Sequence, residues 1–251
     1  MTTLIGEYFS PWTEKARWAL DHHGVKHEYR EHVPLLGEPL LRVRARQLGG
    51  RVSVPLLVSS EQILRDSFDI AQHADRMGSG SSLFPREHLT EVSAWNQRSE
   101  AALRAARALY LGRVLGSPGA QLEMQPAFLP QALRKASVPA TGLAIAFLRR
   151  KYGISAAAED EHESSLAREL DALREALGSK GGGYLVGDRV TYADVAMAVT
   201  LQFVSPVADR HVPLGPATRA SCVHERLAKR YLDLIAWRDA LYERHRGASS
   251  W

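Results

Sequence analysis

The chain has 251 residues but a single cysteine, Cys222. One cysteine excludes an internal disulfide bond and a cysteine-rich metal site, and we expect it to be a buried, small apolar residue. No apolar run approaches the roughly 18 residues of a membrane-spanning helix, and the first residues do not resemble a secretory signal. These absences, with so little cysteine, predict a cytoplasmic protein without a membrane partner.

An excess of one charge is also missing. The chain has 32 Lys and Arg residues against 28 Asp and Glu residues, a formal net charge of +4. The arginines are spread along the chain without a dense basic block, so we expect no nucleic-acid partner. No metal is expected either, because the spacing of the histidines does not match a set of metal ligands. These histidines are His22, His23, His27 and His32. The 45% of hydrophobic residues is sufficient for a packed core.

The first 77 residues alternate between strand-like and helix-like patterns. Strands are expected at 3–9, 27–33, 52–59 and 62–64, and helices at 12–23, 38–47 and 67–76. The order β-α-β-α-β-β-α predicts a compact α/β domain over residues 1–77.

Residues 78–87 are predicted to be a linker, because a Gly/Ser-rich run is followed by Pro85. The pattern beyond it is helical, which predicts an all-helical domain over residues 88–251. The expected helices are 91–115, 140–152, 159–177, 192–204 and roughly 222–246. Between 116 and 140, short or kinked helices are predicted by Pro118, Pro126, Pro130 and Pro139.

The start of the helix at 192–204 has a strong local signal. Thr191 and Asp194 form a variant of the capping box, and Val190 with Val195 can form a hydrophobic staple. We interpret this motif as a helix start without chemistry.

The most informative position is Ser10, where the first strand gives way to the first helix. It is expected at or next to the helix N-cap, with Pro11 near the first helical position. A hydroxyl beside unpaired N–H groups and the positive end of a helix dipole can hold an anion, and a thiolate would suit this place. The alternative is a serine that only caps the helix.

Taken in order, these motifs resemble the soluble glutathione transferase superfamily. The resemblance covers nearly the whole chain and is carried by Val54-Pro55 before the third strand, Asp66-Ser67 at the third helix, Leu83-Phe84-Pro85, and Gly187-Asp188 with Thr191 and Asp194. It implies a thioredoxin-like α/β domain followed by an all-α domain. It also implies a cytoplasmic homodimer that uses glutathione as co-substrate.

The resemblance implies that Ser10 donates a hydrogen bond to the glutathione thiolate. Lowering a thiol pKa from about 8.5 to about 6.5 requires roughly 2.7 kcal/mol. A hydrogen bond to a charged acceptor supplies about 1.5–3 kcal/mol and a helix terminus about 0.3–1 kcal/mol, which together suffice. Tyr8 is the second choice, since other members use a tyrosine at the strand end. Trp12 flanks the thiol or serves in packing.

Two further motifs have a physical reason to bind glutathione. If the Val54-Pro55 bond is cis, the backbone of Val54 faces outward and can pair with an extended peptide. The Ser67 hydroxyl and the adjacent helix N-terminus can hold the γ-glutamyl carboxylate, while Asp66 meets its ammonium. A plain N-cap is the alternative for Asp66 and Ser67.

The chain also departs from the family pattern. Ser10 and Thr13 stand where redox members have a CxxC pair, so dithiol exchange is not expected. Ser53 stands near the place of a common lysine. Arg51 is therefore a candidate for the glycyl carboxylate. Other candidates are Arg42, Arg44 and Arg46. A solvated helix face explains these three arginines equally well.

An electrophile pocket is expected along the helix at 91–115. Its candidates are Arg104, Arg107, Tyr110 and Val114. The implied function is a glutathione transferase that conjugates small electrophiles or reduces peroxides. Two alternatives stay open, namely a non-catalytic binding or assembly module and a glutathione-dependent isomerase or lyase.

Overall fold

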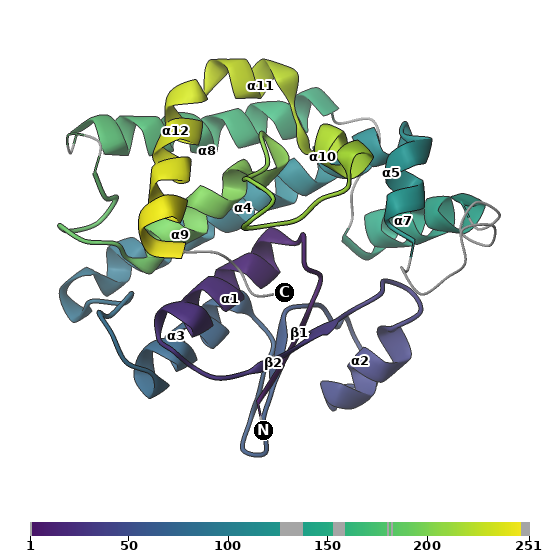
Figure 1. The fold of residues 1–251 in the computed structure, drawn as a ribbon, viewed down its shortest axis with the longest axis horizontal. Coiled ribbons are helices and arrows are strands. Elements are labelled where there is room, and N and C mark those ends of the chain that lie inside the picture. Colours follow the sequence, from purple (N-terminus) through teal and green to yellow (C-terminus); the bar gives the residue numbers. More distant parts are fainter. Residues whose placement is uncertain (1, 126–137, 153–158, 180, 182, 247–251) are drawn as a thin grey trace.

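The computed structural model describes residues 2–125, 138–152, 159–179, 181 and 183–246. A small mixed sheet with its flanking helices lies below a larger helical region (Figure 1). This is the expected α/β unit followed by a helical unit. The proposed limits of 1–77, 78–87 and 88–251 stay a prediction.

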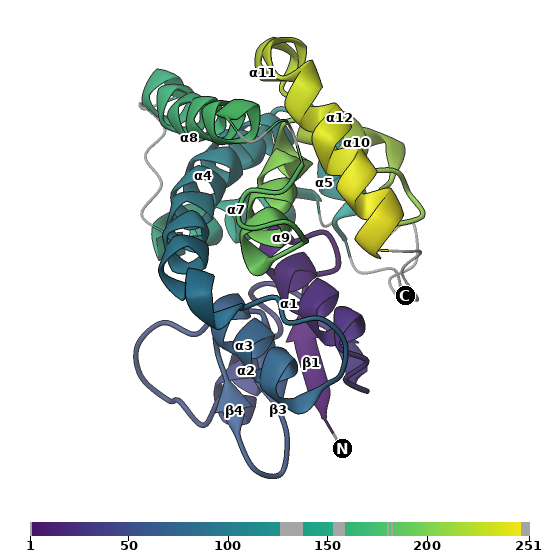
Figure 2. The ribbon, with the colours of Figure 1, turned by 90° about the vertical axis from the view of Figure 1, so that its left-hand side faces the viewer.

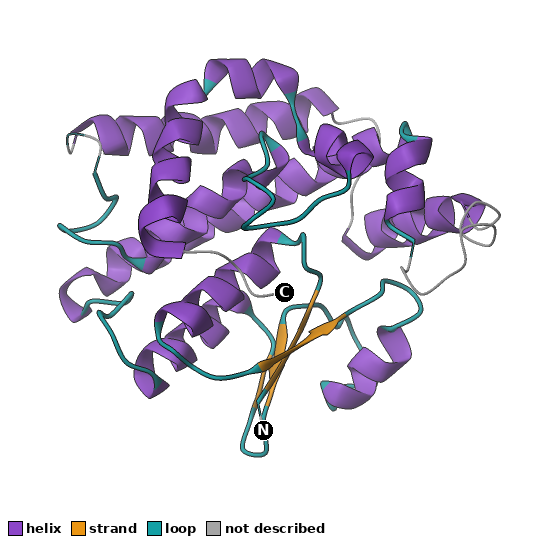
Figure 3. Cartoon of the chain, in the orientation of Figure 1, coloured by secondary structure: helices purple, strands orange, loops and turns teal. Residues whose placement is uncertain are grey.

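The sheet has four strands in the order β2-β1-β3-β4 (Figure 3). They are β1 (Thr3–Gly6), β2 (Glu28–Glu31), β3 (Leu56–Val58) and β4 (Ile63–Leu64). β2 is parallel to β1, whereas β3 is antiparallel to both β1 and β4. The parallel pair is connected through a helix, as such a pair requires.

Three helices cover the two faces of this sheet. They are α1 (Pro11–His22), α2 (Glu38–Arg44) and α3 (Ser67–Met77). Neighbouring side chains of a strand point to opposite faces. Leu4 accordingly packs in the main core with α1 and α3, whereas Ile5 joins a second cluster with Leu41 of α2. The helices α1 and α3 therefore lie on one face and α2 on the other.

β1 ends at Gly6, earlier than the expected strand at 3–9. The Ser10 N–H donates to the Glu7 carbonyl at 2.9 Å and closes a turn before α1. Thr13 of α1 packs so closely against Gly6 that no Cβ fits there. The Thr13 hydroxyl also accepts a hydrogen bond from the Glu7 N–H at 3.2 Å. Thr13 thus fixes the path from strand to helix.

β3 is likewise shorter than the expected strand at 52–59. The Val54–Pro55 peptide bond is cis, and the strand begins only after it, at Leu56. Three residues pair β3 with β1, and β4 completes the hairpin.

The helical region is built around α4 (Leu89–Leu115). This helix packs against several other helices of the region (Figure 2). These others are α5 (Pro118–Glu123), α7 (Val138–Tyr152), α8 (Glu159–Ser179), α9 (Tyr192–Ala198), α10 (Pro216–Cys222), α11 (Glu225–Arg230) and α12 (Leu232–Leu241). A 3₁₀ turn at Arg86–His88 precedes α4.

The proline-rich segment is partly described. α5 is short and starts with Pro118, as expected of a proline in a first turn. Pro139 lies in the first turn of α7. Pro126 and Pro130 lie outside the described residues. Cys222 is buried at the end of α10.

The predicted capping box at α9 is confirmed. The Asp194 carboxylate accepts hydrogen bonds from the Thr191 N–H at 2.8 Å and the Leu185 N–H at 2.7 Å. The α-helix is shorter than the expected 192–204, because it changes to a 3₁₀ segment over Val199–Phe203.

The single helix expected at roughly 222–246 is wrong. The structure has α10, α11, α12 and a π-helical turn at Tyr242–Arg246 instead. Two residues explain the breaks. His224 caps the start of α11 with an extended backbone, so the helical conformation does not continue from α10. Tyr231, between α11 and α12, is buried and donates its phenol to Asp171 of α8 at 2.8 Å, so tertiary packing overrides the helical pattern.

The end of the described chain is attached to α1 by buried charges. Arg246 donates to Glu14 at 2.8 Å and to Asp21 at 2.9 Å. The Arg246 and Glu14 side chains are almost fully buried. Among the described residues, no helix is long and apolar enough to cross a membrane.

Candidate functional site

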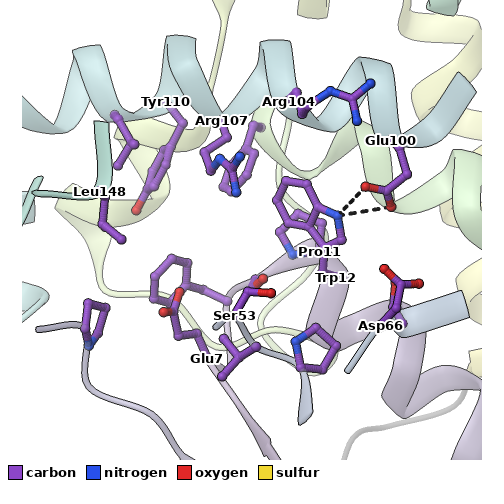
Figure 4. Close-up of a pocket in the computed structure, with 18 of the residues that line it drawn as sticks. Glu7, Pro11, Trp12, Ser53, Asp66, Glu100, Arg104, Arg107, Tyr110 and Leu148 are labelled. Atoms are coloured by element: carbon purple, nitrogen blue, oxygen red, sulfur yellow. Dashed lines mark hydrogen bonds between the residues drawn. The ribbon is translucent and has the colours of Figure 1, made fainter. Parts of the chain in front are cut away.

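A cavity of about 260 Å³ lies between the sheet domain and the helical region. Its lower side comes from the turn after β1, the start of α1, the loop before β3 and the start of α3. Its upper side is α4, from which Glu100, Arg107 and Tyr110 point toward the cavity, and Arg104 lines it as well (Figure 4). The predicted glutathione residues Val54-Pro55 and Asp66-Ser67 therefore share one cavity with the electrophile candidates Arg104, Arg107 and Tyr110.

Ser10 lies in the wall of this cavity at the N-cap of α1. Its side chain makes no capping hydrogen bond, although the residue has the extended backbone of an N-cap. The interpretation of Ser10 as a serine that only caps the helix therefore lacks its defining contact. The hydroxyl is available to a ligand at the positive end of a twelve-residue helix.

Tyr8 is not among the described residues that line the cavity. Its ring packs edge-on against Phe9, and its N–H donates to the Glu31 carboxylate at 3.2 Å. Burial, followed by the Glu31 charge, raises the pKa of the Tyr8 phenol. The phenol therefore stays protonated, and what disfavours Tyr8 as the activating residue is its place outside the described lining of the cavity.

Trp12 connects the two walls of the cavity. Its indole Nε1 donates to Glu100 of α4 at 2.8 Å, and the Arg107 guanidinium lies 4.7 Å from the centre of its ring. The buried Lys15 ammonium is 2.5 Å from the same Glu100 carboxylate. Burial acts to raise the Glu100 pKa, but the Lys15 charge and the two hydrogen bonds lower it below its usual value. Glu100 is therefore a carboxylate at neutral pH.

Val54 and Pro55 form the floor of the cavity. No backbone hydrogen bond involves Val54 within the described part of the chain. Its N–H and C=O are thus available to an extended peptide, the arrangement that the cis bond was expected to create.

Asp66 and Ser67 open α3 at the mouth of the cavity. The Asp66 carboxylate caps the helix by accepting the Phe68 N–H at 2.7 Å. Partial burial raises the Asp66 pKa, and the Glu100 charge acts in the same direction. Ser67 is buried against the Tyr192 phenol. Two carboxylates, Asp66 and Glu100, therefore face this end of the cavity, which suits a ligand ammonium.

The predicted arginines fall into two groups. Arg51 lines the cavity and donates to the Lys151 carbonyl at 3.2 Å. Arg42 instead holds the loop after α2 by donating to the Gly50 carbonyl at 2.9 Å. Neither Arg44 nor Arg46 is among the described lining residues. Arg65, which precedes Asp66, lines the cavity as well.

The end of the cavity under α4 is largely aromatic and apolar. Tyr110 stacks on Phe203 with ring centres 4.5 Å apart and lies 6.3 Å from Phe9. Leu111, Met124 and Leu148 complete this wall. Val114, a sequence candidate, is fully buried in the core and is not a described lining residue. Burial raises the Tyr110 pKa well above its usual value, so the phenol is neutral.

Glu7 places a carboxyl in the same apolar end. It lies across the cavity from Arg107 and Tyr110 (Figure 4). Burial, and next the Glu31 charge, raises the Glu7 pKa to about 7. No group of three His, Cys, Asp or Glu side chains able to hold a metal ion occurs among the described residues.

Two family models match the chain. The N-terminal domain of glutathione S-transferases matches residues 4–82, and their C-terminal domain matches residues 156–241. The chain belongs to the glutathione S-transferase superfamily. A search of curated proteins found no match.

Solved structures of superfamily members share this fold over nearly their whole length. A glutathione S-transferase from Methylobacillus flagellatus with glutathione bound is 16% identical, with a TM-score of 0.61 and coverage of 97% of this chain and 96% of that one. A Methylobacterium radiotolerans transferase in complex with glutathione sulfonate is 16% identical, with a TM-score of 0.62 and coverage of 100% and 96%. A β-etherase from a Sphingobium species is 17% identical, with a TM-score of 0.62 and coverage of 97% and 95%.

Three charged residues that line the cavity were missed by the sequence analysis: Glu7, Arg65 and Glu100. Glu100 had a usable signal, because it precedes Arg104 and Arg107 at helical spacing and so shares their face. Glu7 is a lone acid at the end of an apolar strand, a weaker signal. Arg65 had none apart from its place beside Asp66.

Proposed function

We propose that the protein is a glutathione transferase in which Ser10 stabilises the glutathione thiolate. One observation carries the proposal: Ser10 lines the cavity, and its side chain does not cap the helix whose N-terminus it occupies. A serine hydroxyl and adjacent N–H groups at this place can stabilise a negatively charged sulfur. The solved relatives with glutathione or glutathione sulfonate support the choice of ligand.

The remainder of the cavity suits the other parts of glutathione. The Val54 backbone would pair with the cysteinyl residue, and Pro55 fixes its direction. Asp66 would accept the γ-glutamyl ammonium, while Ser67 and the α3 N-terminus hold the γ-glutamyl carboxylate. Arg51 would hold the glycyl carboxylate at the basic side of the cavity.

The chemical step follows from this placement. The thiolate attacks an electrophilic carbon, or a peroxide oxygen, held against Tyr110 and Arg107. Much of the acceleration comes from holding both reactants in one cavity and from ionising the thiol before the electrophile arrives. Trp12, fixed by Glu100 and covered by Arg107, flanks the sulfur. Such conjugation would serve detoxification.

A glutathione-dependent lyase is the second candidate. The similarity to a β-etherase over nearly the whole chain favours it, and the same thiolate would serve. A cytoplasmic location, consistent with a single buried cysteine, and a homodimeric assembly are part of the proposal. Sedimentation of the purified chain tests the assembly.

Calorimetric titration with glutathione, combined with a turnover assay on chlorodinitrobenzene, tests the proposed function. We expect saturable binding of one glutathione per chain and steady conjugation by the wild type. Binding without turnover of any electrophile would instead identify a non-catalytic module. Absence of binding would refute the proposal.

A further inference from the structure

The carboxyl group of Glu7 has an unusual position for a charged side chain. It lies in the cavity wall and makes no hydrogen bond or ion pair with any other described residue. Its own backbone is fixed from both sides, because its N–H donates to Thr13 and its carbonyl accepts from the Ser10 N–H at 2.9 Å. The side chain is therefore held at the cavity by a rigid turn, and within the described part of the chain no hydrogen bond to its carboxyl is found.

The same turn connects Glu7 to the thiolate site. Only Tyr8 and Phe9 separate Glu7 from Ser10, and the turn that contains both is closed by a hydrogen bond between them. Both line one cavity, with the aromatic wall of Tyr110 and Phe203 opposite Glu7. An electrophile stacked on that wall would meet the sulfur from the Ser10 side and the carboxyl from the Glu7 side.

The charges that face Glu7 come from four elements. Glu31 of β2 and Glu38 of α2 disfavour its ionisation, whereas Lys151 of α7 and Arg107 of α4 favour it, and burial outweighs each of them. Lys151 is engaged by Glu38 at 2.5 Å, and Arg107 lies over Trp12. Protonated and ionised Glu7 are therefore both populated near neutral pH, with a pKa of about 7.

An always ionised Glu7 would work against the proposed function. A carboxylate next to the thiolate site repels the sulfur charge and raises the thiol pKa. A carboxylic acid does not repel it, and it can donate a proton during the reaction. The position is thus suited to a group that is neutral when the electrophile binds.

We propose that Glu7 is a general acid that protonates an oxygen leaving group, and that the electrophiles are aryl compounds with such a group on the attacked carbon. The inference rests on the proposed function and extends it to a substrate class. Aromatic rings suit the Phe9, Tyr110 and Phe203 wall, because offset or stacked rings attract one another.

The step balances without another reactant. The glutathione sulfur donates an electron pair to the carbon and forms the C–S bond. The C–O bond breaks, and its electron pair goes to the leaving oxygen. That oxygen takes the proton of Glu7 and departs as a phenol or alcohol. Glu7 remains as a carboxylate and regains a proton from water. A chloride leaving group needs no proton, so Glu7 should not assist it.

This difference defines the experiment. The probes are phenacyl chloride and two aryl phenacyl ethers, with phenol and nitrophenol as leaving groups, which share one attacked carbon. For the wild type and for Glu7→Gln, we measure the ether-to-chloride ratio, which is the kcat/KM for an ether divided by the kcat/KM for phenacyl chloride. We expect the ratio for the phenol ether to fall about 100-fold or more in Glu7→Gln, the usual contribution of a general acid. The nitrophenol ether should be affected less, since nitrophenolate leaves more easily.

Glu31→Gln is the matched control. Glu31 is a neighbouring carboxyl whose pKa is also raised by burial to about 7, but it is not a described lining residue of the cavity. It bonds instead to Tyr8 and Tyr29. We expect Glu31→Gln to keep the wild-type ether-to-chloride ratio at pH values well below 7, where Glu7 stays protonated with or without the Glu31 charge. A pH profile adds a second readout: ether cleavage by the wild type should decline above about pH 7, where Glu7 loses its proton.

The outcomes separate the two proposals. If the wild type turns over the chloride but Glu7→Gln keeps the ether-to-chloride ratio, or if no ether reacts, the assignment of Glu7 is overturned and the transferase proposal stands. If the wild type turns over neither these probes nor chlorodinitrobenzene, the transferase proposal fails and the role of Glu7 fails with it. An equal loss of the ratio in Glu31→Gln would also overturn the assignment.

Discussion

The Lys15 ammonium of α1 lies 2.5 Å from the Glu100 carboxylate of α4, and the lysine side chain is fully buried. Lys15 also donates to Asn96 and Ser99 of α4 at 3.3 Å. The pair therefore connects the sheet domain to the helical region directly beside the cavity. It also holds the carboxylate that accepts the Trp12 indole.

Lys15→Met should destabilise the fold. Removing one partner of a buried ion pair leaves the other without compensation, which typically costs about 3–5 kcal/mol. Because Glu100 is 26% exposed, water can solvate it in part, and we expect roughly 3 kcal/mol, the lower end of that range. Denaturant unfolding measures the loss. The exposed pair Arg30–Glu28 gives the control, since Arg30→Met should cost less than about 1 kcal/mol. Equal losses in both variants would contradict a structural role for Lys15.

Asp66→Asn should weaken glutathione binding without weakening the helix. Asparagine caps a helix about as well as aspartate, so the bond to the Phe68 N–H can persist. The substitution removes the negative charge that we propose binds the γ-glutamyl ammonium. A hydrogen bond to a charged group is worth about 1.5–3 kcal/mol, or roughly 10- to 100-fold in Kd. Calorimetry checks this. Asp69→Asn, an exposed acid in the same turn, should bind as the wild type does; unchanged binding by Asp66→Asn would refute the assignment.

Glu7→Gln should change how stability depends on pH. The pKa of Glu7 is raised from 4.5 to about 7 in the folded protein. Its stabilising contribution is therefore fully present below pH 4.5, where both states are protonated, and is lost as the pH rises through about 7. The amide side chain that replaces Glu7 in the variant cannot ionise. At pH 8 it should be more stable than the wild type by roughly 1–3 kcal/mol, and below pH 4.5 the difference should vanish. A difference independent of pH would contradict the raised pKa.

The fold was predictable where one local rule decided the structure. Thr191 with Asp194 marked the start of α9, and the order of strands and helices up to α3 followed from periodicity. The rules did not fix element ends, which depend on tertiary contacts. β1 stops at Gly6 because Thr13 packs against it, and α11 ends at Tyr231, whose phenol bonds to α8.

The site was predictable where its residues mark the turns and helix starts of the first domain. Ser10, Val54 and Asp66 stand at turns and helix starts that the sequence marks, and the structure brings them to one cavity. Glu100 and Glu7 could not be assigned in the same way. Glu100 reaches the site only because α4 packs on α1, and the titration of Glu7 depends on burial and on charges from four distant segments.

The most direct test of the central claim is the ionisation of bound glutathione. The thiolate absorbs in the near ultraviolet, so its absorbance can be followed against pH for saturated protein. We expect a midpoint near 6.5 for the wild type and a shift toward 8.5 for Ser10→Ala, which loses roughly 1.5–3 kcal/mol of hydrogen bonding to the charged sulfur. Tyr8→Phe should keep the wild-type midpoint. A Ser10→Ala midpoint equal to that of the wild type would contradict the account.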